Sequence, residues 1–136
     1  MLGEQIQELK GKVISQRVVD VEPPTMETSV SSSGSIKGTQ VTEMLTFVGR
    51  PISTSKGVLH GKGIGIIMAA GESDVATFTG EAVGRLGSSG NISWRGSIFC
   101  STSSNGKLSF LNNMIGVFES ETDAEGNFSE KMWEWK

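Results

Sequence analysis

Two charged side chains interrupt apolar patterns at positions where they could do chemistry. Glu43 and Arg17 each fall in a stretch in which every second residue is apolar. A charged group on an inward face must be paired or shift its pKa, and such groups gather at functional sites. We therefore expect Glu43 and Arg17, joined by His60 or Glu81, to form a polar ligand-binding site inside the fold. The alternative is that these faces point to solvent or to an interface, where the charges are satisfied.

The sequence carries no recognisable catalytic or metal-binding set. His60 is the only histidine, and nothing near it in sequence completes a nucleophile–base–acid triad. One histidine and one cysteine do not make a zinc site. Cys100 shares its parity with Trp94 and Ile98, a pattern typical of a small core residue rather than a nucleophile. We predict no catalytic residue, no metal and no cofactor.

Glycines recur at every second position in the run HGKGIGII, at residues 61, 63 and 65. A dinucleotide-binding loop would need these glycines in a turn that opens a helix, but an apolar strand pattern continues instead. Glycine inside a strand marks a sharp bend or the close approach of a bulky group. We therefore expect a bare stripe on one face of a strand, over which large side chains pack.

Two of the three tryptophans, Trp133 and Trp135, lie within the ending KMWEWK. They share a parity, so both rings project from one face of the last strand. The prediction is that this strand closes a barrel and that both rings are buried over Gly61, Gly63 and Gly65. A second interpretation is that the tryptophans and glycines together line an open cup for an apolar ligand. Because a small barrel leaves little internal space, we favour the filled interior.

The elements that must position these residues are strands. Period-two alternation and strand-forming residues run through most of the chain, and turn signals such as GSSGN, NG and AEGN separate the segments. Only GEQIQELKGK, at the start, could form one helical turn. Short connections favour antiparallel neighbours. The fold class expected is all-β, with about eight antiparallel strands in a closed, mostly up-and-down barrel. The expected strands are 12–22, 26–38, 39–50, 58–71, 75–86, 92–104, 107–121 and 128–136.

Composition indicates a single domain spanning residues 1–136. Twelve Lys+Arg against 15 Asp+Glu give a net charge of −3, which argues against a nucleic-acid partner. No stretch approaches the roughly 20 apolar residues that span a bilayer, and the start lacks the pattern of a signal peptide. A single cysteine gives no support to a secreted origin. We expect a soluble cytoplasmic protein with no membrane partner.

Five segments, taken together, resemble a group of small uncharacterised single-domain proteins of the allene-oxide-cyclase-like and dirigent-like class. These segments are GKGIGIIM, TGEAVGR, SWRGSIFCSTSS, LNNMIGVFESETDAEGN and KMWEWK. The resemblance covers the chain from about residue 10 onward, and its likeness to the enzymes themselves is architectural. It implies an eight-stranded antiparallel barrel, a homo-oligomer (trimer or dimer) and an apolar cavity at the barrel mouth. No enzyme motif matches residue by residue, so no catalytic residue is carried over.

Three functional hypotheses follow. The first is a non-enzymatic module, either structural or binding a small apolar molecule, that acts as a homo-oligomer. The second is a cyclase or isomerase that guides its substrate by shape, with Glu43 and Arg17 as polar groups in an apolar cavity. The third is an interaction module in which the polar strand METSVSSSGS (26–35) offers a free pairing edge.

Overall fold

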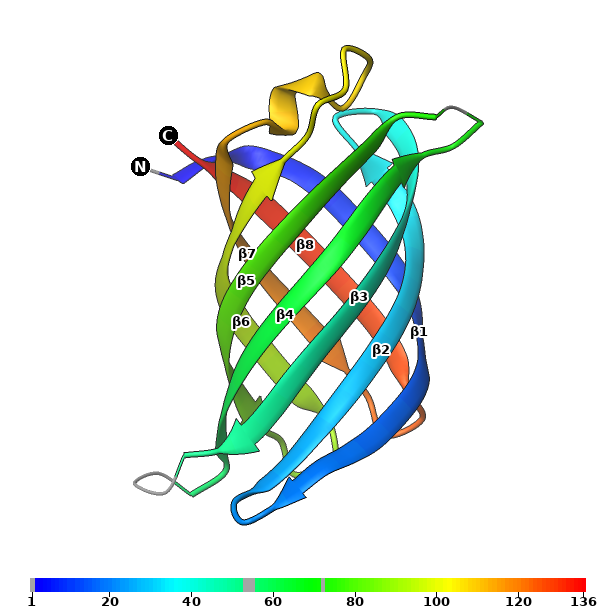
Figure 1. The fold of residues 1–136 in the computed structure, drawn as a ribbon. Helices are drawn as coiled ribbons and strands as arrows, with labels where there is room; N and C mark the ends of the chain where they lie inside the picture. The colour runs from blue at the N-terminus through cyan, green and yellow to red at the C-terminus, as the bar shows by residue number, and fades with distance from the viewer. Residues whose placement is uncertain (1, 53–55, 72) are drawn as a thin grey trace.

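The computed structural model describes residues 2–52, 56–71 and 73–136, and within them eight strands form one closed barrel. Each strand pairs antiparallel with the next along the chain, and β8 returns to pair with β1 (Figure 1). The strands are β1 (Leu2–Val21), β2 (Pro24–Ile36), β3 (Thr39–Pro51), β4 (Val58–Ala69), β5 (Val75–Leu86), β6 (Ile92–Ser101), β7 (Met114–Thr122) and β8 (Asn127–Trp135). The predicted up-and-down barrel is confirmed.

Two boundaries differ from the sequence-based expectation. The first strand starts at Leu2 rather than at residue 12, so GEQIQELKGK is extended and not helical. The segment expected as a strand from residue 107 begins with a short 3₁₀ helix, η1 (Ser109–Leu111), and β7 starts only at Met114. Pairing with β8 explains the first difference, because tertiary hydrogen bonding overrides weak local helix propensity.

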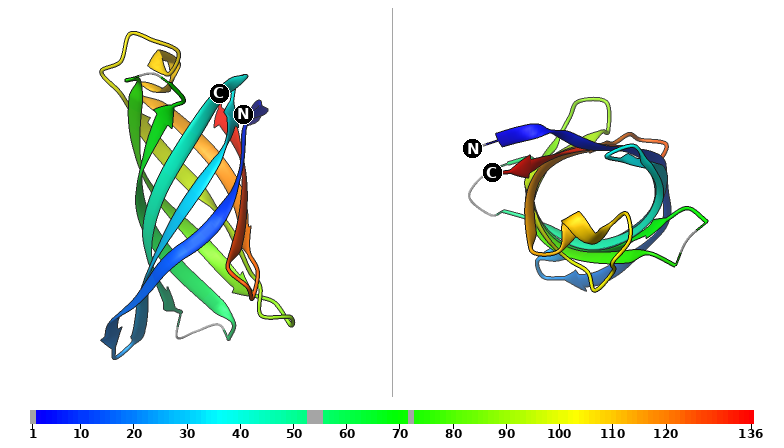
Figure 2. Two further views of the ribbon diagram at one scale, coloured as in Figure 1. Left: turned by 90° about the vertical axis from the view of Figure 1, so that its right-hand side faces the viewer. Right: turned by 90° about the horizontal axis from the view of Figure 1, so that it is seen from above.

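Alternating side chains divide the barrel into an interior and an outer face. η1 lies at one end of the barrel, over part of its opening (Figure 2, right). Leu108 and Leu111, in and next to this turn, are fully buried. The carboxylate of Asp74 accepts the backbone N–H of Leu108 at 2.8 Å, which holds the start of this turn. Both chain termini lie at this same end (Figures 1 and 2).

The β1–β2 hairpin projects beyond the opposite end of the barrel (Figure 1). β1 pairs with β8 only as far as Lys12, although β1 itself continues to Val21. Within the described part of the chain, residues 14–21 therefore have a strand partner on one side only, and we call them the free edge. The third hypothesis placed a free edge on residues 26–35. That placement is wrong, because β2 is paired with β1 and β3 along this whole stretch.

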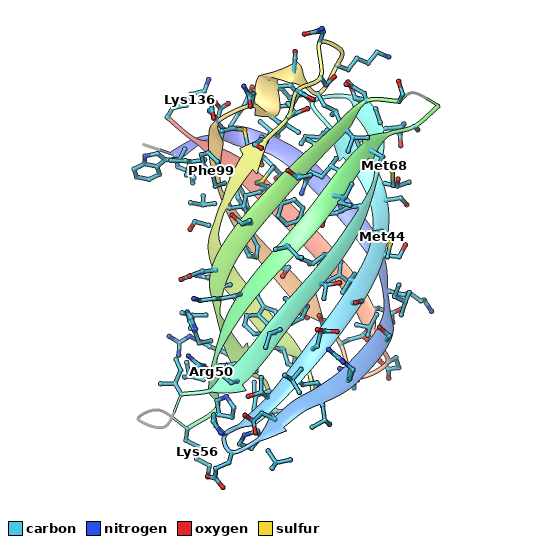
Figure 3. The ribbon with its side chains drawn as sticks, viewed as in Figure 1. Met44, Arg50, Lys56, Met68, Phe99 and Lys136 are labelled. Carbon is cyan, nitrogen blue, oxygen red and sulfur yellow. The ribbon has the colours of Figure 1, made fainter. Side chains whose placement is uncertain are left out.

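The outer face of the barrel carries exposed apolar side chains over β3 to β7. Met44, Met68 and Phe99 are among them (Figure 3). Register places Met44 beside Ile66 and Phe99 beside Ile115. In the described residues, no helix has the length and apolar character needed to cross a membrane.

Candidate functional site

The glycine stripe is covered by Trp94 of β6, which projects across the interior onto β4 and β5. A Cβ added at Gly61 would lie 2.9 Å from the Trp94 ring, and one at Gly84 would lie 2.8 Å from it. A Cβ at Gly65 would overlap the ring of Phe78. Glycine is needed at these positions because any side chain would displace an aromatic ring. The expected bare stripe is present, but the rings that fill it come from β5 and β6.

Trp94 also forms the floor of a recess at the open end of the barrel. Phe47 packs edge-on against Trp94, with ring centroids 5.4 Å apart and planes at 71°. Between these rings and the projecting β1–β2 hairpin lies a recess of about 470 Å³, which we call the cup. Its mostly apolar walls come from the barrel mouth and from the projecting hairpin, and include Val13, Val18, Val21, Met26, Thr28, Leu59, Ile92 and Thr122.

The indole N–H of Trp94 is buried, and Trp94 is only 6% exposed. No hydrogen-bond acceptor for this N–H is found in the described residues. A buried donor without a partner costs on the order of 1–3 kcal/mol, which a bound ligand or water would recover. The floor of the cup therefore carries a buried N–H donor that has no acceptor among the described residues.

Between Trp94 and the end that carries η1, the interior of the barrel is largely filled. The remaining cavity has a volume of about 50 Å³, and its lining includes Phe47, Phe78, Trp94, Phe118, Phe128 and Glu130. This is room for a few atoms or an ordered water, not for a drug-sized molecule. The cavity thus connects the floor of the cup to a buried carboxyl group.

Glu130 of β8 is one of two buried glutamates in the interior. Its Oε1 accepts a hydrogen bond from Gln7 Nε2 at 2.7 Å. Burial raises the pKa of Glu130 to about 7, and the bond from Gln7 only partly opposes this rise. Near neutral pH the group therefore has both a protonated and an ionised form, as a proton-transfer group requires.

Glu43 of β3 is the second buried glutamate and is only 1% exposed. Neither of its carboxyl oxygens has a hydrogen-bond partner in the described residues. Burial, and then repulsion by Glu130, raise the pKa of Glu43 well above its usual value. The predicted interior position of Glu43 is thus observed, with a second carboxyl group as its electrostatic neighbour.

Cys100 lies in the core and is fully buried, as its parity indicated. Burial, with smaller effects from Glu43 and Glu130, raises the pKa of its thiol to about 12. A thiol with so high a pKa carries almost no thiolate at neutral pH and is a poor nucleophile.

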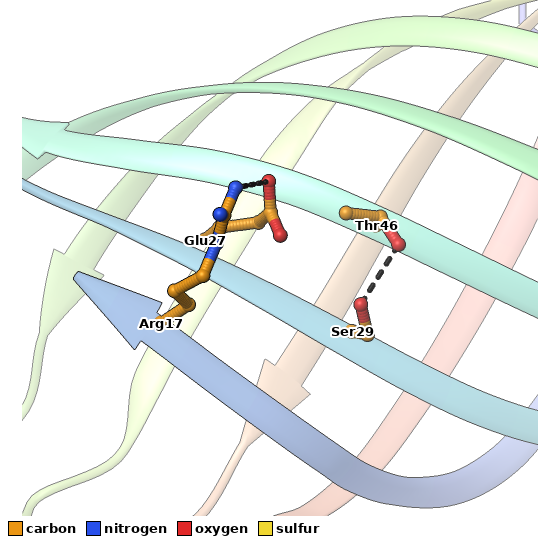
Figure 4. A network of polar contacts seen from close by, with 4 residues as sticks. All are labelled: Arg17, Glu27, Ser29 and Thr46. Carbon is orange, nitrogen blue, oxygen red and sulfur yellow. Dashed lines mark hydrogen bonds and ion pairs between the residues drawn. The ribbon is translucent and has the colours of Figure 1, made fainter. Parts of the chain in front are cut away.

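Arg17, expected beside Glu43, lies instead on the outside of the barrel. Its Nη2 is 3.3 Å from Glu27 Oε2, and its side chain is 71% exposed (Figure 4). The same outer surface carries a hydrogen bond of 2.8 Å between the hydroxyls of Ser29 and Thr46 (Figure 4). A register shift between Val13 and Ser15 explains the error, because one extra residue reverses the parity of everything after it.

His60 and Glu81 also lie outside, on neighbouring strands. His60 Nε2 is 3.8 Å from one oxygen of Glu81, and Lys62 Nζ is 3.5 Å from the other. Since the glycines at 61, 63 and 65 face inward, the residues that alternate with them must face outward. The structure therefore brings none of Arg17, His60 and Glu81 together with Glu43.

Trp133 and Trp135 do not cover the glycines, and that prediction is wrong. Trp135 is 54% exposed and Trp133 is half-buried. The inward face of β8 carries the other parity, with Phe128, Glu130 and Met132. Both tryptophans therefore lie outside the interior, near the end of the barrel where β1 and β8 pair irregularly.

Sequence reasoning missed Trp94 and Glu130 as site residues. Both carried a signal in their alternation. Trp94 was recognised as a pattern-mate of Cys100, and Glu130 lies between two apolar residues of equal parity, Phe128 and Met132. The second signal was overlooked because the adjoining tryptophans suggested the opposite face.

No group of three or more His, Cys, Asp or Glu side chains in the described residues is arranged to hold a metal ion. Comparison of the chain with protein-family models, with curated proteins and with solved structures found no match. The features of the structure that bear on function are therefore the cup, the cavity and the buried carboxyl groups.

Proposed function

We propose that this protein binds a small apolar molecule in the cup at the open end of the barrel. The observation that carries the proposal is the unpartnered N–H of Trp94 at the floor of a mostly apolar recess of about 470 Å³. Ligand sites are typically recesses of about 300–1,000 Å³, with apolar walls and a few polar groups that orient the guest.

Support also comes from the apolar residues that the cup leaves unpacked. Val18, Val21 and Met26 line the cup and are 63%, 77% and 42% exposed. A guest that covers these side chains gains about 25 cal/mol for each Å² of apolar surface removed from water.

The test is a titration with N-phenyl-1-naphthylamine, a neutral apolar probe that fluoresces when it leaves water. We expect saturable binding at one site per chain. Met26→Glu should weaken this binding at least tenfold, because it places a charge on the cup wall. Met44→Glu is the matched control, since Met44 is 41% exposed but lies on the outer face. Equal effects of the two substitutions, or no saturable binding, would remove the cup as the site.

A second candidate is an isomerase or cyclase that works by proton transfer. Glu130 favours it, because a carboxyl group with a pKa of about 7 borders the internal cavity. Such a group could remove a proton from carbon next to a carbonyl and return it to the same molecule. In D₂O, 2-decanone should then exchange its α-protons for deuterium, and Glu130→Gln should abolish the exchange. Binding without exchange would leave only the carrier role.

We also propose that a second copy of the chain pairs with the free edge, which would make the protein a dimer. Unpaired strand edges attract other strands, and residues 14–21 expose Ile14, Val18, Val19 and Val21. Antiparallel pairing about a two-fold axis between Val18 and Val19 would set Arg17 of each copy opposite Asp20 of the other. Arg17 pairs with Glu27 and Asp20 pairs with Thr25, and because these two β2 residues have the same parity, Arg17 and Asp20 lie on one face of the sheet.

The dimer is tested by sedimentation at several protein concentrations. Arg17→Asp should shift the protein toward monomer, and the double variant Arg17→Asp/Asp20→Arg should restore the dimer. Glu27→Gln removes only the partner of Arg17 within the chain, so it should leave the dimer intact. If the wild-type protein is monomeric at all concentrations, the free edge has no self-pairing role.

A further inference from the structure

The buried charges of the barrel have one sign. Glu43 and Glu130 are buried in the interior, whereas no lysine, arginine or histidine is buried in the described part of the chain. A buried pair of acids without a basic partner is costly in its ionised form. The interior therefore has no positive charge of its own beside these acids, and a positively charged guest would supply one.

The polar atoms left without partners around these glutamates are mainly acceptors. They include both carboxyl oxygens of Glu43 and the amide oxygen Oε1 of Gln7, and the hydroxyl of Ser32, also without a partner, can either accept or donate. Ser32 lies directly opposite Glu43 in the β2–β3 register, and Gln7 holds Glu130 through its other amide atom. Acceptors require donors, so the guest that completes this group carries N–H or O–H bonds.

The internal cavity provides room for such a group. Its lining includes Glu130 and Trp94 but not Glu43, and Trp94 is also the floor of the cup. Its volume of about 50 Å³ accommodates a head group of one or two heavy atoms, while the much larger cup takes the apolar body. A shift of the Trp94 ring would join the two spaces.

We propose that the natural ligand is an apolar molecule that ends in a protonated amine, and that its ammonium group enters the internal cavity and binds at Glu130. This inference rests on the proposed function and adds the ligand's charge class to it. An ammonium group supplies three donors and one positive charge, which matches a buried acid that borders the cavity and has no basic partner. An anionic head group, such as that of a fatty acid, meets two acids and no buried base, so the site rejects it.

The test compares three probes with the same chain length, namely decylamine, decanol and decanoate, by calorimetry at about pH 8 and below their micelle concentrations. We expect decylamine to bind at least tenfold more tightly than decanol, and decanoate to bind most weakly. Glu130→Gln should bring decylamine to within about threefold of decanol. Glu119→Gln is the matched control, because it removes an exposed carboxylate that lines neither the cavity nor the cup.

The wild-type protein provides a second measurement that does not depend on the variants folding. Glu130 ionises near pH 7, whereas an alkylamine stays protonated, as a lysine with a pKa of about 10.4 does. The affinity for decylamine should rise at least fivefold between about pH 6 and about pH 8, and that for decanol should not change. Equal binding of decylamine and decanol, or tightest binding of decanoate, would overturn the inference and leave the cup as a ligand site. Failure of all three probes and of the neutral naphthylamine would overturn the proposed function as well.

Discussion

The interior of the barrel is covered differently at its two ends. At the closed end, η1 covers the interior with Leu108 and Leu111, and Asp74 satisfies a backbone N–H of that turn. At the open end, Trp94 covers the interior but its own N–H has no partner, and apolar residues above it remain exposed. If the cup binds a ligand as proposed, stability and ligand binding are separated along the barrel axis, with Trp94 at the boundary.

The largest expected effect comes from the boundary itself. Trp94→Ala should cost about 3–5 kcal/mol of unfolding free energy, because it empties the space above Gly61 and Gly84. Trp135→Ala should cost below about 1 kcal/mol, since Trp135 is 54% exposed. Urea unfolding of both variants measures the difference. Similar losses in the two would mean that the last strand, and not Trp94, closes the interior.

The closed end should depend strongly on one leucine. Leu111→Ala removes a fully buried side chain and should cost about 2–5 kcal/mol in urea unfolding. The same assay should report below about 1 kcal/mol for Met26→Ala at the open end, where the side chain is 42% exposed. If Met26→Ala proves as costly as Leu111→Ala, the proposed division between a stabilising and a binding end fails.

The buried acids should make the ligand-free protein less stable as pH rises. The pKa of Glu130 is raised from 4.5 to about 7 on folding, so the unfolded chain loses this proton first. Stability should therefore fall between about pH 4.5 and 7, by about 3 kcal/mol from Glu130 alone, and then level off for this group. Glu130→Gln should flatten the fall, which denaturant melts at several pH values would detect. A wild-type protein that becomes more stable over this range would contradict the raised pKa.

A smaller loss of stability is expected when a side chain is added at Gly84, against which the Trp94 ring packs. Gly84→Ala places a methyl group about 2.8 Å from the Trp94 ring and should cost about 1–3 kcal/mol. In the double variant Gly84→Ala/Trp94→Phe the smaller ring relieves the overlap, so the two losses should not add. Additive losses in urea melts would show that Gly84 and Trp94 do not depend on each other.

Sequence patterns predicted the barrel well because turn chemistry and period-two alternation are local. The strands from β2 to β6 matched within a few residues, but the connection at NG is longer than expected and contains η1 before β7 begins. Alternation also separated Glu43 and Cys100 from their neighbours as inward residues. What alternation alone does not decide is which of the two faces of a strand is the inner one.

The errors in the site have that origin. In β8 both faces carry large apolar residues, so the alternation did not distinguish the face with Trp133 and Trp135 from the face with Phe128 and Met132. In β1 the register shift after Val13 turned Arg17 outward, and nothing in the local sequence marks such a bulge. Glu43 and Glu130 repel each other across the barrel from β3 and β8, two strands far apart in sequence. Only the closed barrel reveals this repulsion.

The most direct test of the account uses the indole N–H resonances of the three tryptophans. In ¹⁵N-labelled protein titrated with N-phenyl-1-naphthylamine, the Trp94 resonance should shift and saturate with the binding curve. The resonances of Trp133 and Trp135 should stay in place, because these side chains lie outside the interior. Movement of Trp133 or Trp135 with an unchanged Trp94 would contradict the claim that Trp94 is the floor of a ligand-binding cup.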